Sequence, residues 1–424
     1  MKRIVLFYEH VNREYDALKR IANEIHQLAP TLYDVEIRDY TFEWLGTVKS
    51  LQKRPVYAVV VPFLYSDVPD YAPILPFRKQ RDVNCKVFNL HHEQIAAPFN
   101  DAYQLPNGAL ARNGCIHCAW GKDYARRLRE RGVNNNLIVV TGNARLDAIC
   151  NGVQISRDEL AQTYGLDASK KWVLYCEGRQ ERPMNRESRT KHPVLGKLSE
   201  EAYEALCMQE LRSLALTKVQ FKRLPSSFFE QFELIYRPHP GTIAVDVDYR
   251  IKTIADLPVY TWLSQASLVL VWNSTTAFEA NVFGVPVLRH EPIKNDSMFR
   301  AYGLSSFPVI EDLVQINIEG IERLCSEQKG ADYYAPYYGK VDGCSAQRTA
   351  LAIVDSIERD GVDLESTGLS DSSLKKEYRR MFLRNAIGNT FERLGILRFT
   401  KWPKAAYVHL DEKRQLALLD KTTE

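Results

Sequence analysis

Two stretches of this sequence, Tyr-Arg-Pro-His-Pro-Gly (Tyr236–Gly241) and Val-Trp-Asn-Ser-Thr-Thr-Ala-Phe-Glu-Ala (Val271–Ala280), decide the fold. Each follows a short apolar, β-rich run, Phe232–Tyr236 or Leu268–Val271, so each is predicted to begin where a strand ends. In open α/β sheets, ligands bind outside the carboxyl ends of the strands, where two such loops can face one site. The first loop offers a guanidinium and an imidazole. The second offers hydroxyl and amide side chains and then a helix N-terminus, which favours an anion. Together the loops predict a site for the phosphates of a nucleotide.

The same alternation of strands and helices runs through most of the chain. A helix is expected over Asp16–Leu28 because Leu18, Ile21, Ile25 and Leu28 recur at helical spacing. Further strands are expected at Arg3–Tyr8, Asp34–Ile37, Tyr57–Val61, Lys86–Leu90, Ile116–Trp120, Leu137–Val140 and Trp172–Cys176. This rhythm predicts an α/β fold with two Rossmann-like domains, each built on a mostly parallel, doubly wound sheet, facing each other across a cleft.

The length of 424 residues exceeds what one ordinary core supports, which favours two domains. We expect an N-terminal acceptor domain over residues 1–150, a linker over 151–170 and a C-terminal donor domain over 171–355. Residues 356–424 are expected to form a basic amphipathic C-terminal extension that is helical.

The charge of the chain is concentrated near its C-terminus. The net charge is only +3, yet residues 374–404 hold nine Lys or Arg against Glu377 and Glu392. Aromatic and aliphatic residues such as Phe382 and Trp402 are interleaved with them. Such a segment is typical of attachment to an anionic membrane surface. It is equally typical of a helix that packs its apolar side on the body of the protein, and the two interpretations are compatible.

Several classes of protein are disfavoured by what the sequence lacks. No apolar run approaches the roughly 20 residues that span a bilayer, and the N-terminus is too short for a signal peptide. We therefore expect a cytoplasmic protein, peripheral to the inner face of the cytoplasmic membrane through residues 374–404, with its eight cysteines as thiols. Neither a phosphate-binding loop nor Gly-x-Gly-x-x-Gly after the first strand is present, which argues against ATPases and NAD enzymes. No cofactor and no nucleic-acid partner are expected.

With these segments laid out, residues 1–350 resemble the GT-B class of glycosyltransferases. Within that class the chain is similar to the bacterial surface carbohydrate (capsule and O-antigen) biosynthesis group. That group is related in pattern to CDP-glycerol glycerophosphotransferases and to capsule transferases that use CMP-activated sugars. The motifs that carry the resemblance are Glu9–Glu14, His91–Glu93, Trp120–Gly121, Thr141–Asp147, Arg237–Pro240 and Trp272–Gly284 with Pro286.

The resemblance implies a metal-independent, inverting enzyme. It would move a sugar from a nucleotide-activated donor, preferably a CMP- or CDP-linked one, to a lipid-linked or growing saccharide. His239 would act in catalysis by donating to a phosphoryl oxygen as negative charge develops, with Arg237 beside it. Glu279 would hold a ribose hydroxyl; the alternative is that it only compensates the helix dipole. Further donor-binding residues are Ser274, Thr275 and Thr276, which would form a phosphate cradle or merely an N-cap, and Gly178 and Arg179 in the first turn of the donor domain.

The first domain would supply the base that removes the acceptor's proton. Glu93 is expected first and Glu9 second, with His10 and His92 as further candidates just past strand ends. Because neighbouring residues of an extended segment point to opposite faces, His91 and His92 are expected to diverge. Asn143 and Arg145 are expected at the cleft, and the alternative for Arg145 is a pairing with Asp147.

Two patterns that suggest metals are disfavoured. Cys115-Ile-His-Cys118 has no second half of a zinc site, and Asp246-Val247-Asp248 matches an acidic triplet that GT-B enzymes generally do not need. No metal site is expected.

Three other functions stay open. A CDP-glycerol-type polyol phosphotransferase and a sugar-nucleotide 2-epimerase share the expected fold, although an epimerase has no use for a membrane segment. A non-catalytic scaffold that binds nucleotide sugars is the third.

Overall fold

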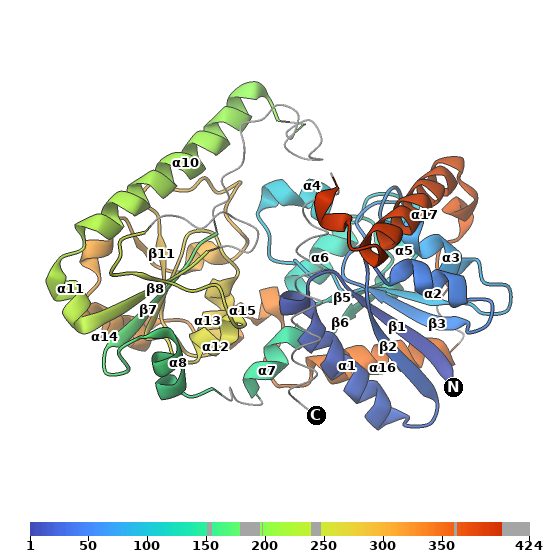
Figure 1. Ribbon diagram of the computed structural model, residues 1–424, viewed down its shortest axis with the longest axis horizontal. Helices are drawn as coiled ribbons and strands as arrows, with labels where there is room; N and C mark the ends of the chain where they lie inside the picture. The colour runs from blue at the N-terminus through green and yellow to red at the C-terminus, as the bar shows by residue number, and fades with distance from the viewer. Residues whose placement is uncertain (151–154, 179–195, 197, 239–246, 360–362, 401–424) are drawn as a thin grey trace. The chain divides into compact units, whose positions relative to one another are not determined.

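Two parallel six-stranded sheets organise the chain in this computed structural model (Figure 1). The structure describes residues 1–150, 155–178, 196, 198–238, 247–359 and 363–400. Unit 1 comprises residues 1–94, 104–147 and 339 onward, and unit 2 comprises residues 95–103 and 148–338. The predicted α/β class with two parallel, Rossmann-like sheets is confirmed.

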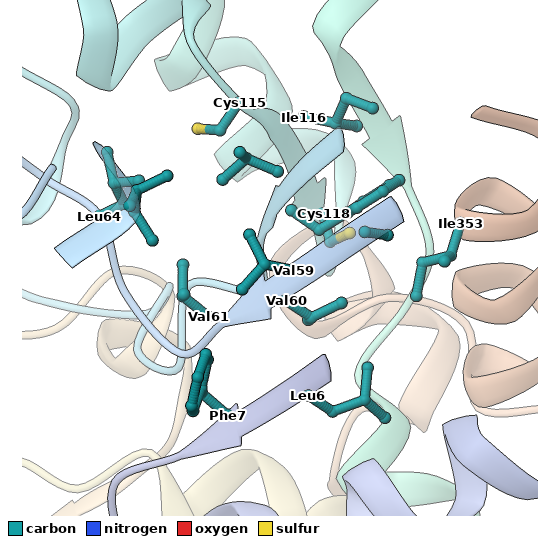
Figure 2. Packing of buried hydrophobic residues seen from close by; sticks show 14 of the residues in the cluster. Leu6, Phe7, Val59, Val60, Val61, Leu64, Cys115, Ile116, Cys118 and Ile353 are labelled. Atoms are coloured by element: carbon teal, nitrogen blue, oxygen red, sulfur yellow. The ribbon is translucent and has the colours of Figure 1, made fainter. Parts of the chain in front are cut away.

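The first sheet has the strand order β2-β1-β3-β4-β5-β6. Strand β1 has six buried residues in succession, because in a parallel sheet covered on both faces neither side of a central strand meets water. Figure 2 shows Val59, Val60 and Val61 of β3 within this core, with Ile353 of a covering helix nearby. The strands are β1 (Lys2–Tyr8), β2 (Tyr33–Asp39), β3 (Val56–Val61), β4 (Lys86–Asn89), β5 (Ile116–Ala119) and β6 (Ile138–Val140).

The helices of unit 1 come from both ends of the chain. Helix α16 packs against α1, and α17 packs against α2. Since α16 and α17 follow Gly339, the chain completes its first unit only after it has built the second. The helices are α1 (Asp16–Leu28), α2 (Trp44–Ser50), α3 (Leu75–Arg78), α5 (Ala109–Asn113), α6 (Lys122–Glu130), α16 (Ser345–Glu358) and α17 (Ser372–Arg393), with α4 (Asp101–Gln104) and α7 (Asp147–Cys150) at the points where the chain passes between units.

The return of the chain into unit 1 depends on two glycines with positive φ. A Cβ on Gly339 (φ 90°) would lie 2.3 Å from the Trp120 carbonyl oxygen and 2.8 Å from the Gly142 Cα. A Cβ on Gly142 (φ 86°) would lie 2.4 Å from the Ser345 Oγ. Only glycine allows these close approaches. The domain boundaries expected from the sequence are not tested by this division into two units, and they stay a proposal.

The second sheet has the strand order β12-β11-β10-β7-β8-β9. Numbered by their occurrence within the unit and counted from β9, the strands run 3-2-1-4-5-6, the order of a dinucleotide-binding Rossmann sheet. The strands are β7 (Lys171–Cys176), β8 (Phe232–Arg237), β9 (Lys252–Thr253), β10 (Leu268–Val271), β11 (Val287–His290) and β12 (Val309–Ile310). The helices are α8 (Arg157–Tyr164), α10 (Glu200–Arg223), α11 (Ser226–Gln231), α12 (Val259–Leu263), α13 (Thr276–Val282), α14 (Ile318–Glu327) and α15 (Ala331–Tyr338).

A short segment from the first part of the sequence belongs to unit 2. The Phe99 amide donates to the Met298 carbonyl, and the Tyr302 amide donates to the Ala96 carbonyl, each over 3.1 Å. The Tyr302 hydroxyl donates to Asp101 over 2.7 Å. Residues 95–103 are therefore held by the loop that follows β11. Within the part of the chain that the structure describes, no helix is both long enough and apolar enough to cross a membrane.

Candidate functional site

The second sheet changes direction between β7 and β10, and the loops after these two strands meet there. A Cβ on Gly178 would lie 3.2 Å from the Asn273 carbonyl oxygen, so the two backbones are in direct contact. Asn273 is fixed in turn, because its side chain donates to the Phe299 carbonyl and accepts from the Ala301 amide. A topological switch point at the carboxyl edge of such a sheet is where ligands bind.

Charged side chains surround the end of β7. Burial raises the pKa of the Cys176 thiol to about 12, the nearby Arg237 opposes this rise, and the carboxylates of Glu279 and Glu177 add to it. Glu279 of α13 and Arg237 of β8 thus lie near the same strand end. The structure brings together Gly178, Arg237 and Glu279, three residues that the sequence assigned to the donor.

The hydroxyl row at the start of α13 is only partly used within the protein. The Ser274 Oγ donates to the Thr276 Oγ1 over 3.0 Å and accepts from the Thr276 amide. Thr275 occupies the N-cap position without a side-chain capping bond. The hydroxyls of Ser274 and Thr276 are therefore bonded to each other within the turn, whereas that of Thr275 makes no capping bond.

The Arg237 side chain is hydrogen-bonded to backbone carbonyls of a neighbouring turn. Its guanidinium donates to the carbonyls of Asp256 and Leu257, each over 2.9 Å, and to that of Ala255 over 3.5 Å. Leu257 has φ 63°, which is rare for a residue with a side chain. Arg237 therefore holds a strained turn beside the strand end. Two further predicted donor residues, Arg179 and His239, lie outside the described residues.

In unit 1, a small cavity of about 50 Å³ lies at the carboxyl edge of the sheet. Phe7 of β1 and Pro62 after β3 form part of its wall, at the point where the order of this sheet reverses. Among the residues predicted for the acceptor, His92, Asn143 and Arg145 line the cavity together.

Glu14 is the lining residue that the sequence reasoning missed. Its Oε2 accepts from the Glu9 amide over 2.6 Å and from the His10 amide over 3.3 Å, so the carboxylate is fixed by the turn that follows β1. Its Oε1 lies 3.7 Å from the His92 Nδ1. Both side chains are mostly buried. Glu14 belongs to the motif that begins at Glu9, but only the fold shows that it turns towards His92.

The two carboxylates first expected as the base occupy different surroundings. Glu93 is exposed, and its Oε2 accepts from the Gln104 Nε2 over 3.2 Å. Glu9 is half-buried, and its charge contributes to raising the pKa of buried Tyr40, after the larger effects of burial and of Asp70. His10 is half-buried beside it. None of Glu93, Glu9 and His10 is among the residues that line the cavity.

His91 and His92 occupy different surroundings, but the extended segment from which the sequence argument derived their divergence is absent, because His91 has a positive φ. His91 is fully buried with φ 49°, and its Nε2 lies 2.7 Å from the His117 Nδ1. Its Nδ1 lies 2.9 Å from the Tyr124 hydroxyl, and the His117 Nε2 lies 2.8 Å from the Arg112 carbonyl. Burial lowers the pKa of both imidazoles, to about 4 for His117. His91 thus anchors the turn from which His92 reaches the cavity.

The Thr141–Asp147 motif joins the cavity to α16. The Asn143 side chain accepts from the Arg145 amide over 3.1 Å and so begins the turn that carries Arg145. The Asp147 carboxylate accepts from the Ser345 and Ala346 amides over 3.1 and 2.7 Å. Asp147 therefore caps α16. The sequence pattern indicated Asp147 only as a partner of Arg145 and did not predict this role.

The residues of the two metal-like sequence patterns that the structure describes are buried thiols or part of an ion pair. Cys115 and Cys118 are buried thiols in the core of unit 1, and the Asp248 carboxylate pairs with Arg250 over 2.8 Å. Asp246 lies outside the described residues. Among the residues that are described, no group of three or more His, Cys, Asp or Glu could hold a metal ion.

Comparisons with known proteins identify the fold. No protein-family model and no curated protein sequence matches the chain. Solved structures do match, and S. aureus MnaA in complex with UDP aligns with a TM-score of 0.52 and 16% identity over 86% of this chain and 100% of its own. A candidate UDP-N-acetylglucosamine 2-epimerase from Listeria monocytogenes aligns with a TM-score of 0.51 and 16% identity over 87% of this chain and 100% of its own.

The wall teichoic acid polymerase TagF is a third similar structure. It aligns with a TM-score of 0.57 and 12% identity over 85% of this chain and 90% of its own, and a histidine variant of it was soaked with CDPG. These likenesses span most of the chain, so the GT-B fold expected from the sequence is confirmed.

Proposed function

We propose that this chain is a GT-B glycosyltransferase that takes a nucleotide-activated sugar, preferably a cytidine one, for surface polysaccharide assembly. The nucleotide phosphates bind at the carboxyl edge of the second sheet, beside Gly178, Ser274 and Thr275, with Glu279 on the ribose. Arg179 and His239 complete this site in the proposal. The acceptor, a lipid-linked or growing saccharide, binds unit 1. No metal takes part.

The observation that carries the proposal is the contact of Gly178 with Asn273 at the switch point of a Rossmann-ordered sheet. A side chain at residue 178 would press on the backbone of Asn273, so glycine there favours the close approach of the two loops beside which the phosphates are proposed to bind. The nucleotides in the MnaA and TagF structures give further support, because those proteins share the fold.

A thermal-shift panel with CMP, CDP, UDP, GDP and dTDP tests the donor site. A nucleotide at 100 times its Kd adds about 2.7 kcal/mol to the stability of the native state. We expect one nucleotide, CMP or CDP, to stabilise the wild type, and His239→Ala and Glu279→Ala to lose most of that shift. Glu322→Ala, an exposed acid on α14, is the matched control and keeps it. If no nucleotide stabilises the wild type, the proposal fails.

For the chemistry in unit 1 we propose His92 as the base, oriented by Glu14. A carboxylate beside Nδ1 favours the tautomer with its proton on Nδ1, which leaves Nε2 free to accept a proton from an acceptor hydroxyl. The distance of 3.7 Å is long for a hydrogen bond, but such contacts commonly tighten when substrate binds. Glu93 and Glu9 are the alternative bases.

Single substitutions separate these bases. A general base contributes roughly 100- to 10,000-fold to the rate, so His92→Asn is expected to lower kcat by at least 100-fold. Glu14→Gln is expected to lower kcat and to shift the pH profile, because the tautomer of His92 is no longer fixed. The measurement is transfer of sugar from the nucleotide that the thermal-shift panel identifies. If Glu93→Gln or Glu9→Gln carries the loss and His92→Asn does not, the base is that carboxylate.

We also propose that residues 374–404 attach the enzyme to an anionic membrane surface. One side of α17 packs inward, with Leu374 buried and Tyr378 against Trp44. The other side exposes Leu383, Ile387 and Leu394 among basic residues. In this proposal the packing and the membrane attachment of the basic segment use different faces of one helix.

Deleting the helix would uncover the core, so substitutions are the better test. Leu383→Gln/Ile387→Gln/Leu394→Gln is expected to weaken sedimentation with vesicles that contain anionic lipid. Leu28→Gln/Leu32→Gln, which changes exposed leucines elsewhere in unit 1, is expected to bind as the wild type does. Equal binding by all three proteins would contradict attachment through α17.

A 2-epimerase is the second candidate, favoured by the fold shared with the Listeria structure. Incubation with a nucleotide sugar alone distinguishes the two reactions. A transferase leaves the sugar's configuration unchanged until an acceptor is added, whereas an epimerase interconverts two nucleotide sugars without one. A polyol phosphotransferase would instead transfer a phosphate along with the donor group.

A further inference from the structure

A second and much larger cavity, about 490 Å³, lies in unit 1 between β2, α2 and α17. It forms because successive side chains of β2, an edge strand of the sheet, point to opposite faces. Tyr33 of β2 contacts Glu358 of α16 on one face, while Glu36 and Arg38 point to the opposite face. That charged face is only partly covered by α2, and α17 closes the remaining space from the side.

The lining of this cavity is strongly cationic. It contains one carboxylate, Glu43, and five cations, which are Arg3, Arg38, Lys49, Arg54 and Arg393. Three of the cations are held by acids behind them, as in the contact of the Arg3 Nη2 with Glu36 over 2.7 Å. Among the described residues no ion pair is found for Lys49 or Arg393, and the Lys49 ammonium lies 6.0 Å from the centre of the Phe382 ring, a contact that leaves its charge without a counter-ion. Their charges are therefore available to an anion that enters from solvent.

Helix α17 presents two neighbouring faces at this point. Ala386, Asn389 and Arg393 recur at helical spacing and line the cavity. Leu383, Ile387 and Leu394 recur on the adjacent face and are 62%, 48% and 65% exposed. Lys376, Arg379 and Arg380 flank this apolar stripe. A cationic cavity thus opens beside an exposed apolar strip that is bordered by positive charge.

We propose that this cavity binds the phosphate head group of a single anionic phospholipid, whose acyl chains extend along the Leu383–Leu394 stripe. Lys49 and Arg393 contact the phosphate, since Lys and Arg are the residues that bind phosphate oxygens most strongly. The volume falls within the roughly 300–1,000 Å³ of ordinary ligand sites. A soluble anion would gain nothing from the stripe, whereas a lipid uses both surfaces. This inference rests on the proposed membrane attachment and adds a defined lipid site to it.

Monomeric short-chain lipid tests the site without a bilayer. Titration calorimetry would measure binding of dihexanoyl phosphatidylglycerol, below its micelle concentration, to the full-length protein. We expect saturable one-to-one binding, with Lys49→Ala/Arg393→Ala weakened roughly thirtyfold, since each surface charge contributes about a factor of five. Lys19→Ala/Lys122→Ala removes the same charge from exposed positions elsewhere in unit 1 and is expected to bind as the wild type does.

Three results would overturn the lipid site. The first is that the monomeric lipid does not bind, and the second is that the two double variants bind it equally. The third is full displacement of the lipid by equimolar inorganic phosphate, which would show that the ligand is a free anion. Vesicle sedimentation of the same proteins keeps the two proposals apart. If vesicles bind the wild type and monomeric lipid does not, membrane attachment stands and the lipid site fails. Loss of both removes the attachment on which the site rests.

Discussion

At the scale of single residues, the buried histidine pair shows how the fold assigns protons. The His117 Nε2 faces the Arg112 carbonyl, which can only accept, so that nitrogen carries the proton. The His117 Nδ1 then accepts from the His91 Nε2, and the His91 Nδ1 accepts from the Tyr124 hydroxyl. Each ring is therefore neutral, with one fixed tautomer. A proton added at the His91 Nδ1 could be donated to the Tyr124 hydroxyl oxygen, whose own proton then goes to the Gln104 carbonyl 3.2 Å away. Burial of the charge therefore opposes protonation of the pair.

This pair predicts that the protein loses stability in mild acid. The pKa of His117 falls from 6.5 when unfolded to about 4 when folded, and burial also lowers the pKa of His91 well below 6.5. The unfolded chain therefore binds more protons below pH 6.5, and the free energy of unfolding decreases as the pH falls. We expect a loss of about 1.6 kcal/mol from His117 alone between pH 6.5 and 5.

Urea denaturation across this pH range measures the loss. His117→Gln is expected to flatten the dependence, whatever its effect on stability at pH 7. His26→Asn, a change at an exposed histidine of α1, is expected to keep it. A dependence that His117→Gln leaves unchanged would show that other groups take up the protons.

At the scale of elements, α16 depends on a cap supplied from far away in the sequence. Asp147, which is almost fully buried, accepts from the first amides of a helix that begins at Ser345. Helix α17 has a local cap instead, because exposed Asp371 accepts from the Ser373 and Leu374 amides. The two helices therefore have the same kind of cap in different surroundings.

The two caps predict different losses. Asp147→Ala leaves buried amides without an acceptor and is expected to lower the free energy of unfolding by about 2 kcal/mol. Asp371→Ala leaves amides that water can reach, and it is expected to cost about 1 kcal/mol or less. Urea denaturation of both variants checks the order. Equal losses would mean that the long-range cap adds nothing beyond a local one.

At the scale of the whole molecule, the chain builds two sheets with different strand orders. The first reverses direction between β1 and β3, and the second between β7 and β10. The cavity lined by Glu14 and His92 lies at the first reversal, and the contact between Gly178 and Asn273 lies at the second. The proposed nucleotide site belongs to the second sheet alone, so a nucleotide is expected to stabilise unit 2 directly.

Hydrogen exchange tests this assignment. At 100 times its Kd, a nucleotide slows the exchange of amides that open by unfolding up to about 100-fold. We expect this slowing in β7, β8 and β10 and little change in the strands of unit 1. Slowing confined to β1, β3 and β4 would place the nucleotide on the first sheet. Equal slowing in both units would show that they unfold together.

The positions of the strands were largely predictable, but the surroundings of the site residues were not. The expected strands at Arg3–Tyr8 and Trp172–Cys176 match β1 and β7 within one residue at each end. Their apolar runs are local signals that hold in any tertiary context. Glu14 gave no such signal, because its position 3.7 Å from His92 depends on the turn after β1 and on the strained backbone at His91.

The sequence by itself determined where most of the strands and helix α1 form and that the sheets are parallel, because hydrophobic periodicity and short connections act over a few residues. The tertiary structure alone decided what those elements bring together. It placed Asp147 on a helix about two hundred residues away, turned Arg237 onto the 255–257 turn, and formed a cationic cavity from β2, α2 and α17. Such contacts join residues distant in the chain, and they follow from the packing of whole elements, which no local pattern records.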